Sequence, residues 1–552
     1  MPTDRGHRSI AGFLIVPACL LALLAVPSAS QPDAFAQAAA QATQFERAVS
    51  AARRVLTAWL AAADPKTLLL PDYLDVEPAK RVYTPHNSGA DLYPYLILTA
   101  HLTDPELLDG RLLEMLRNEV RYTTQGSAIP RNLNLTTGEL GPPSFFGAGE
   151  YAKDGLIAVT EYLGRTPWFY RMVDMTADAM ERAPVPSSFG NLPASDPELN
   201  GDYLQTLVRL ATMTGDRRFL EWARRIGDAY VKEVLPGTFG VPGMTWDFQK
   251  HSGDRRLRLR DHGNETVVGL SMLFALERQL GSARAEAYRP VVQRMLDRIL
   301  ASANPDGMLY NEVDAETLAP LDQRLSDNWG YVYGAVYSFY QCTGETKYRD
   351  AVRRVLGNLP HYRKYVWEPG RNPPLGSFDG YADSIESAIY LVAHEPVPEA
   401  FDWIDSEMPV MLAMQRADGH LEDWYGEGNF NRTALLYAFM KSQGVRPDRW
   451  EPGIGVGAVR DGEGLRLVLD MPAARPIRFD FARHRRVLNF DKNYVRLNEF
   501  PEWFTVDENR LYRLRDAGSA ERIALGSELV AGIVMHPGKW TVEPFQPPVS
   551  IR

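Results

Sequence analysis

A stretch near the middle of the chain places a polar segment directly before an apolar segment of helix length. The polar segment, Arg260 to Glu265, reads Arg-Asp-His-Gly-Asn-Glu and holds several groups that can exchange protons. The residues that follow, Val267 to Leu276, are apolar on nearly every side. A helix without a polar face is buried all round. This stretch therefore predicts an inner helix whose N-terminal end opens onto a solvated, acidic space.

The same pattern recurs along the chain, as an apolar helix, a tight turn and then an amphipathic helix. Glycine suits the left-handed residue that ends a helix, and an acid suits the start of the next one. The turn glycines are Gly164, Gly215, Gly281 and Gly344. Inner helices are expected to begin near Asp91, Ala152, Gly201, Glu265, Trp329, Ala382 and Asn431.

These repeats predict a mainly α protein with about six helical hairpins, an (α/α)6 toroid over residues 46–447. An open α-solenoid is the alternative. Residues 31–45, rich in Ala and Gln, are expected to form a loose leader to the first helix. After the Pro and Gly residues near 447–453, the pattern changes to alternating apolar and polar residues. Residues 452–552 therefore predict a small antiparallel β domain, similar to a sandwich.

The first 30 residues have the pattern of a secretory signal peptide. Arg5 and Arg8 precede an apolar run, and small residues at 27–30 offer a cleavage site. The expected location is therefore secreted or periplasmic, with no membrane span after cleavage. An uncleaved anchor and lipid attachment at Cys19 are the alternatives. After cleavage only Cys342 remains, so neither an internal disulfide nor a cysteine-based metal site is expected.

The formal net charge of −10 argues against a nucleic-acid partner, because phosphate binding needs a basic face. In a toroid, the loops before the parallel inner helices gather at one end. In this chain those loops combine acids and amides with large aromatic residues. Helix capping explains each single acid, but it does not explain the aromatic neighbours. Aromatic faces pack on sugar rings, while carboxylates and amides bond the hydroxyls. The predicted substrate-binding residues are His86, Asn87, Trp246, Arg260, Asn264, Asn328, Trp329, Tyr331, Tyr381 and Trp424.

This repeat layout and these loops resemble the six-hairpin glycosidase superfamily. The resemblance covers about 90–445 and an appended β region, and it rests on no diagnostic motif. It implies an α/α toroid with a cleft rich in acids and aromatic residues. It also implies the chemistry of glycoside hydrolases, including unsaturated glucuronyl hydrolases, or that of related polysaccharide lyases.

A glycosidase needs one protonated carboxyl and one ionised carboxylate. The preferred candidates are Asp327 and Asp383 with Glu265, and Asp202 and Asp379 are the second choices.

A lyase acting on a uronate is the alternative activity, and it would abstract a proton through His or Tyr. His262 would be the base, with Tyr331 or Tyr381 as the acid. A non-catalytic carbohydrate-binding protein is a second alternative. Neither a metal nor a cofactor is expected, although a structural Ca²⁺ among the loop carboxylates is left open.

Overall fold

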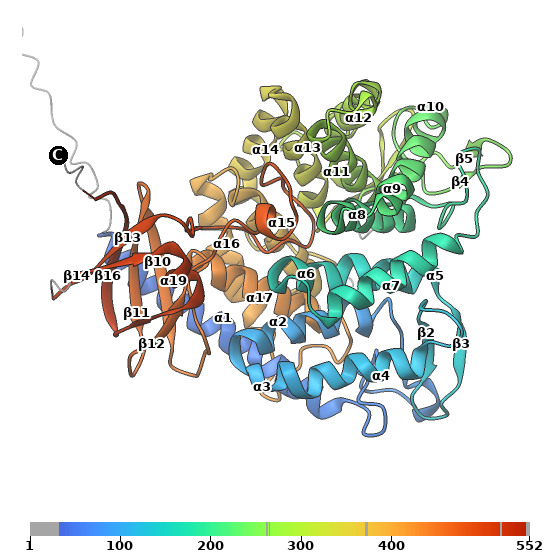
Figure 1. Ribbon diagram of the computed structural model, residues 1–552. Helices are drawn as coiled ribbons and strands as arrows, with labels where there is room; N and C mark the ends of the chain where they lie inside the picture. Colours follow the sequence, from blue (N-terminus) through green and yellow to red (C-terminus); the bar gives the residue numbers. More distant parts are fainter. Residues whose placement is uncertain (1–32, 261–262, 264, 370–373, 519–520, 548–552) are drawn as a thin grey trace, which may run out of the picture. The chain divides into compact units, whose positions relative to one another are not determined.

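The computed structural model describes residues 33–260, 263, 265–369, 374–518 and 521–547. The predicted signal peptide, His262 and Asn264 lie outside the described residues. Ala34–Arg552 is one compact unit, in which helices dominate and antiparallel strands gather toward the C-terminus (Figure 1). The mainly α class with an appended β region is confirmed. None of the described helices has both the length and the apolar character needed to cross a bilayer.

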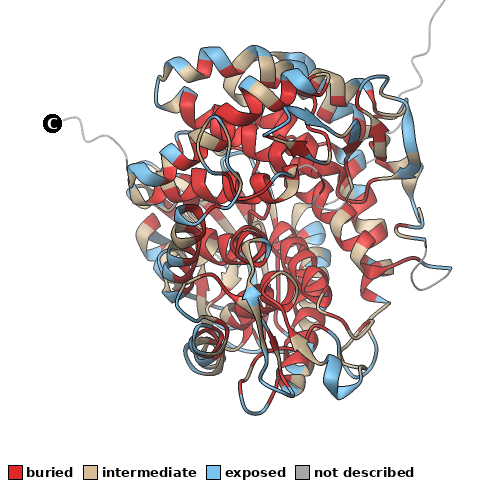
Figure 2. Cartoon of the chain, turned by 90° about the vertical axis from the view of Figure 1, so that its right-hand side faces the viewer, coloured by how far each residue is buried: buried red, intermediate tan, exposed pale blue. Residues whose placement is uncertain are grey.

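The inner helices are nearly all buried, and they form the centre of the helical part (Figure 2). Within the described residues they number seven: α2 (Tyr93–Thr103), α6 (Ile157–Leu163), α8 (Pro197–Thr214), α11 (Glu265–Gln279), α13 (Trp329–Thr343), α15 (Phe378–Val392) and α17 (Glu427–Ser442). As predicted, α11 is buried without a break from Glu265 to Glu277.

Two inner segments begin with a wide π-helical turn. The turn η2 (Ser88–Leu92) precedes α2, and the turn η4 (Tyr151–Leu156) connects α5 (Phe145–Glu150) to α6. Such turns re-aim side chains and are frequent at functional sites.

Each inner segment contacts the next one, and α17 contacts α2, so the first and last inner helices are neighbours. The outer layer consists of α1 (Ala34–Ala62), α4 (Leu113–Thr123), α7 (Pro167–Glu181), α9 (Arg217–Ala229), α12 (Ala283–Ala301), α14 (Thr346–Asn358) and α16 (Pro398–Leu412). The described chain therefore holds seven inner and outer pairs, where about six were expected. The seven predicted inner-helix starts each fall within one of these inner segments.

Two details of the helical prediction need correction. The expected loose leader is wrong from Ala34 onward, because α1 begins there and buries Ala38 and Ala42.

The four turn glycines do adopt positive φ, between 61° and 76°. However, α8, α15 and α17 begin one turn earlier than predicted. In α8 and α15 the reason is that Asp196 and Ser377 accept a hydrogen bond from the first turn and cap the helix there.

Short antiparallel strands interrupt the loops that lead to the inner helices, a feature that the helical pattern did not predict. One sheet consists of β1 (Val82–Tyr83), β2 (Arg131–Asn134) and β3 (Leu140–Pro143), and a pair consists of β4 (Trp246–Asp247) and β5 (Ser252–Gly253). A third sheet consists of β6 (Arg256–Arg258), β7 (Tyr310–Asp314) and β8 (Pro320–Leu325).

The C-terminal strands form two antiparallel sheets. The larger has the order β10-β11-β16-β13-β14, made of Gly455–Asp461, Gly464–Asp470, Gly538–Phe545, Leu511–Asp516 and Glu521–Leu525. The smaller has the order β15-β12-β9, made of Ile533–Met535, Arg475–Arg478 and Arg446–Pro447. Strand β10 packs on α1. The division into separate domains near 447–452 stays a prediction.

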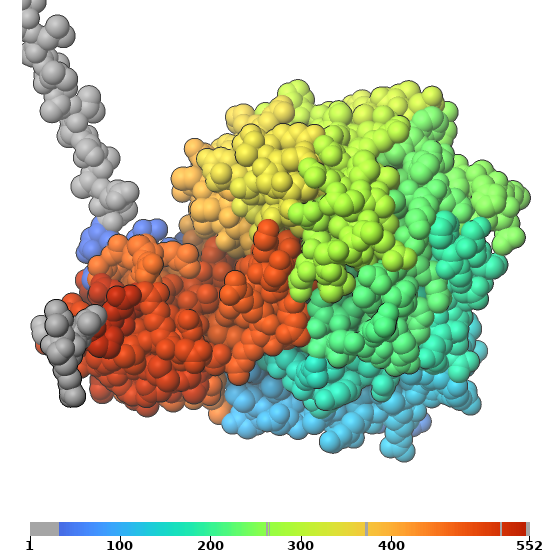
Figure 3. Space-filling view, turned by 45° about the horizontal axis from the view of Figure 1, so that its top comes forward, coloured from blue at the N-terminus to red at the C-terminus, as the bar shows by residue number. Residues whose placement is uncertain are grey.

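Between β12 and β13 the chain leaves the sheets and returns to the helices, through the short helix α18 (Arg483–Arg486). In the space-filling view this orange-red part of the chain lies against green and yellow helical hairpins (Figure 3). Side chains of the inner helices bond its backbone, for example Ser338 to Val495 and Arg209 to Leu497.

Candidate functional site

The N-terminal turns of neighbouring inner helices touch one another. A Cβ added at Gly201 of α8 would lie 2.2 Å from the Glu265 backbone in α11. A Cβ added at Gly428 of α17 would lie 1.7 Å from the Asp91 carbonyl oxygen. The loops before the inner helices therefore gather at one end of the helical part, called the mouth below.

At the mouth, two aspartates stand four residues apart on one face of α15. Asp379 accepts a hydrogen bond from Asn429 Nδ2 at 2.9 Å. Asp383 accepts one from Arg432 Nη2 at 3.0 Å and a longer one from the Tyr331 hydroxyl at 3.4 Å. The Asp383 side chain is 15% exposed. Asp383 thus has a charged partner, Arg432, whereas the hydrogen-bond donor to Asp379 is neutral.

Burial raises the pKa of Asp379 well above its usual range, and repulsion from Glu368, Asp91 and Asp327 adds to the effect. Burial also raises the pKa of Asp383, with repulsion from Asp379 and Asp327, while Arg432 acts in the opposite direction. The structure therefore brings three predicted acids, Asp327, Asp379 and Asp383, within electrostatic reach of one another. Two carboxyls so placed cannot both ionise easily.

The remaining predicted acids, Glu265 and Asp202, surround the fully buried Lys153 of η4. The Lys153 ammonium lies 2.8 Å from Glu265, 2.8 Å from Asp154 and 3.8 Å from Asp202. Gln205 donates to the second Glu265 oxygen at 2.7 Å. Both Glu265 oxygens are therefore engaged. Glu265 acts here as an ion-pair partner rather than as an open proton donor.

Burial would by itself lower the pKa of Lys153, but attraction to Asp154, Glu265 and Asp202 raises it above the usual value. Burial raises the pKa of Asp202 well above its usual range, and repulsion from Glu150 adds to the shift. The pKa of Glu150 is raised for the same reason, with repulsion from Asp154. The cluster thus combines one buried cation with carboxyls that resist ionisation.

Several predicted aromatic platforms are in fact packed core. The Trp329 ring has no exposed surface, and its Nε1 donates to Ser384 at 3.1 Å. Tyr381 is also buried. Trp246 is buried and donates to Glu233 at 2.8 Å. A ring enclosed in this way exposes no open face in this structure, and sugar binding at these positions stays a prediction. Trp424 is buried too.

The exposed aromatic residues near the mouth are ones that the sequence did not single out. Tyr73 is 45% exposed, and its ring centroid lies 6.0 Å from that of Tyr425. Phe146 is 38% exposed and packs on His86, with the centroids 5.3 Å apart. Asp91 and Asp379 lie within electrostatic reach of Tyr425. Tyr73 lies in an irregular loop without periodicity, whereas the Phe-Phe pair at 145–146 was a usable signal.

The remaining predicted binding residues are half-buried or bonded within the loops. Burial lowers the pKa of His86. Asn87 donates to Asp72 at 2.9 Å, and Arg260 pairs with Glu368 at 3.4 Å. The side-chain oxygen Oδ1 of the buried Asn328 accepts a hydrogen bond from the Ser326 hydroxyl at 2.7 Å.

One cluster among the described residues, His420, Asp423 and Glu427, has ligand atoms close enough to share a metal ion. However, one Glu427 oxygen accepts three backbone N–H groups of residues 421–423, at 2.7–2.8 Å. The other oxygen accepts from Trp59 at 2.7 Å and contacts His420 at 3.1 Å. The carboxylate thus already has protein donors, and its role is to hold the loop before α17.

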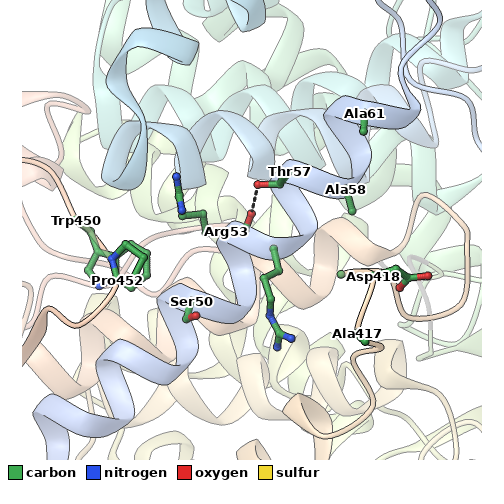
Figure 4. Close-up of a pocket in the computed structure, with 11 residues that line it drawn as sticks. Ser50, Arg53, Thr57, Ala58, Ala61, Ala417, Asp418, Trp450 and Pro452 are labelled. Carbon is green, nitrogen blue, oxygen red and sulfur yellow. Dashed lines mark hydrogen bonds between the residues drawn. The ribbon is translucent and has the colours of Figure 1, made fainter.

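A groove of about 470 Å³ lies on the outer face of α1, and none of its lining residues is a predicted site residue (Figure 4). Arg53, at its edge, already pairs with Asp104 at 2.9 Å. Thr57 bonds the carbonyl of its own helix at Arg53, at 3.0 Å. The groove has no pair of carboxyls comparable to Asp379 and Asp383 among the described residues that line it.

The sequence matches no protein-family model and no curated protein. Similar solved structures include the unsaturated glucuronyl hydrolase of Bacillus sp. GL1, at 14% identity over 56% of this chain and 88% of that chain, with a TM-score of 0.40. A family 76 glycoside hydrolase (mannosidase) from Bacteroides thetaiotaomicron VPI-5482 matches at 12% identity over 71% of this chain and 98% of that chain, with a TM-score of 0.41.

A D-mannose isomerase matches at 11% identity over 59% of this chain and 88% of that chain, with a TM-score of 0.42. Each of the three TM-scores is below 0.5, so these matches decide neither the family nor the activity of this chain.

Proposed function

We propose that the chain is a glycoside hydrolase in which Asp379 donates the proton and Asp383 is the ionised carboxylate. The observation that supports this assignment is their unequal pairing on α15. Arg432 stabilises a negative charge on Asp383, whereas Asn429 is a neutral partner of Asp379. Since two buried neighbouring carboxyls resist ionising together, the proton belongs on Asp379. One protonated and one ionised carboxyl is the pair that glycoside hydrolysis requires.

Asp327 is the third member of the proposed centre. It lies at the start of α13, within electrostatic reach of both α15 aspartates. A carboxylate in this position could orient the sugar or the attacking water. Glu265 and Asp202 are then supporting residues, because Lys153 and Gln205 engage Glu265.

We propose a neutral saccharide rather than a uronate as the substrate. A lyase must neutralise a uronate carboxylate, but Lys153, Arg260 and Arg432 already pair with carboxylates of the chain. The acids at the mouth would also repel an anionic sugar. The exposed rings of Tyr73 and Phe146 offer apolar faces to a sugar ring.

Mutation of the two aspartates tests the mechanism. A panel of neutral and acidic polysaccharides would be screened for new reducing ends and for the ultraviolet absorbance of an unsaturated uronate product. Asp379→Asn and Asp383→Asn should each lower turnover by about 100-fold or more, because each removes an acid–base group. The control is Asp418→Asn, at an exposed aspartate of the outer groove, which should leave turnover unchanged.

Other outcomes of this screen would contradict the proposal. Full turnover in Asp379→Asn would remove that residue as the acid. New ultraviolet absorbance from an unsaturated uronate product would establish the lyase alternative, because β-elimination and hydrolysis both create reducing ends and only β-elimination creates the double bond. Saccharide binding without any turnover in the unmodified chain would support the non-catalytic alternative.

We also propose that the chain is exported, on the basis of the signal-like pattern in residues 1–30. Mass spectrometry of the fractionated protein should find a mature N-terminus close to residue 31 outside the cytoplasm. A full-length chain in the cytoplasm would contradict this.

A further inference from the structure

A segment of the C-terminal region, residues 489–499, enters the helical part and contacts several inner helices. Ser338 of α13 donates to the Val495 carbonyl at 2.9 Å. Arg209 of α8 donates to the Leu497 carbonyl at 2.5 Å. Both donors lie in the C-terminal halves of their helices. The segment therefore enters from the end opposite the mouth.

Buried ion pairs hold this segment in place. Arg496 lies 3.2 Å from Glu161 of α6 and 3.0 Å from Glu499. Arg209 also pairs with Glu161, at 2.8 Å, and His394 lies 3.2 Å from Glu499. The side chains of Arg496 and Glu499 are buried. Buried charges that are bonded on several sides fix a geometry closely, because losing one partner leaves the others uncompensated.

Asn498 lies between the carboxyl cluster around Lys153 and the guanidinium of Arg432, which pairs with Asp383. Its Nδ2 donates to Asp154 Oδ1 and to the Lys153 carbonyl, both at 2.9 Å. Its Oδ1 faces Arg432 Nη1 at 3.4 Å. The residue is buried, and its φ of 60° lies in the left-handed region, which asparagine tolerates better than most residues.

The contacts of Asn498 with Arg432 and with Asp154 together require an amide. Its oxygen accepts from the cation Arg432, and its nitrogen donates to the carboxylate Asp154. A carboxylate at this position would repel Asp154, and an apolar side chain would remove the hydrogen bonds to both Arg432 and Asp154. Arg432 is also bonded to Asp383 and Glu386, so a shift of its guanidinium would move the proposed centre.

We infer that Asn498 is a positioning residue, which the C-terminal segment supplies and which sets the orientation of Arg432 against Asp383. This inference rests on the proposed function. The helical part alone therefore lacks one of the contacts that hold its proposed centre. Asn498 acts through Arg432 and is not itself assigned to contact the substrate.

The test compares Asn498→Gly with Asn489→Gly in the full chain. Asn489 has a φ of 57° and Asn498 a φ of 60°, so both lie in the left-handed region. Glycine adopts that conformation readily, so neither substitution strains the backbone. Asn489 belongs to the same segment, but it is exposed, and its side chain donates to the Thr212 carbonyl, away from the proposed centre. Asn498→Gly should lower kcat by about 10- to 100-fold with little change in KM, because misplacement affects the reacting groups more than binding. Asn489→Gly should change neither constant.

A second variant separates positioning from simple loss of structure. Asn498→Asp keeps the side-chain shape but adds a negative charge beside the centre. That charge should raise the pKa of the proposed acid, so activity should persist to higher pH than in the unmodified chain, although kcat is lower. Unchanged kcat and an unchanged pH profile in both Asn498 variants, with only a lower Tm, would overturn the inference.

Failure of the proposed function can be told apart from failure of this inference. If the unmodified chain acts on no saccharide, the proposed function fails, and the contact is tested through stability. The Tm changes of Asn498→Gly and Arg432→Gln should then be non-additive when the two are combined, as expected for residues in contact. Strict additivity would show that Asn498 does not hold Arg432.

Discussion

At the scale of single residues, the buried carboxyls around Lys153 link folding to pH. The pKa values of Asp202 and Glu150 are raised by burial above the values of the unfolded chain. A carboxyl whose pKa is higher in the folded state than in the unfolded state makes its full contribution to stability at a pH below the unfolded pKa. That contribution is lost as the pH rises through the folded pKa.

Replacing Asp202 by Asn should therefore flatten the dependence of Tm on pH. Between about pH 5 and about pH 8, the fall in Tm with rising pH should be smaller for Asp202→Asn than for the unmodified chain. Asp418→Asn removes the same charge at an exposed position and should give a curve parallel to that of the unmodified chain. Differential scanning fluorimetry across the pH range measures this, and parallel curves for Asp202→Asn would contradict it.

Glu427 shows a different use of a buried acid. Its two oxygens collect three backbone N–H groups, the Trp59 indole and His420. A carboxylate held by so many donors stabilises the loop in front of α17.

Glu427→Gln should lower the free energy of unfolding by about 3 kcal/mol, since the new amide group would face N–H donors. Urea denaturation measures the loss. Glu399→Gln, at an exposed position in the first turn of α16, makes the same substitution and should cost much less. Equal losses in the free energy of unfolding for the two substitutions would mean that the Glu427 hydrogen bonds do not stabilise the fold.

At the scale of elements, close approach of the inner helices depends on glycine at the contact points. Gly201 lets α8 pass directly against the backbone of Glu265 and Thr266 at the start of α11. Any side chain there would push the two helices apart at the level of Asp202 and Lys153.

Gly201→Ala should thus destabilise the chain by about 3 kcal/mol, at the upper end of what overpacking costs. The matched control is Gly357→Ala in the outer helix α14, where an added Cβ meets no atom within 4 Å. That change should be neutral or stabilising by up to about 1 kcal/mol. Denaturation curves for both variants test the difference, and a neutral Gly201→Ala would show that the backbones can separate freely.

At the scale of the whole molecule, the C-terminal sheets and the helices share buried contacts. Gly457 of β10 lies so close to α1 that a Cβ there would meet the Ala38 carbonyl oxygen at 1.9 Å. The buried pair of Arg496 and Glu161 adds a second connection, far from the first in sequence. Regions joined in this way are expected to unfold together.

Calorimetry should therefore show one unfolding transition for the full chain. Arg496→Ala should move that transition to lower temperature without splitting it, because Glu161 would be left as an uncompensated buried charge. Two resolved transitions, of which only one moves in the variant, would mean that the regions unfold independently.

The sequence by itself determined the helical class, the inner helices and their turns. Burial of α11 and the left-handed conformations of Gly215 and Gly344 follow from local patterns, because periodicity and backbone preference act within a few residues. The same patterns identified Asp379 and Asp383 as candidates, although they ranked Asp379 second.

Only the tertiary structure decided which side chains meet. Lys153 with Glu265, and Asn498 with Arg432, are separated by more than 60 residues in each case, and no local pattern connects them. The enclosed ring of Trp329 and the open ring of Tyr73 were equally beyond prediction. Burial and ion pairing depend on how distant elements pack, because desolvation and Coulomb attraction act through space rather than along the chain.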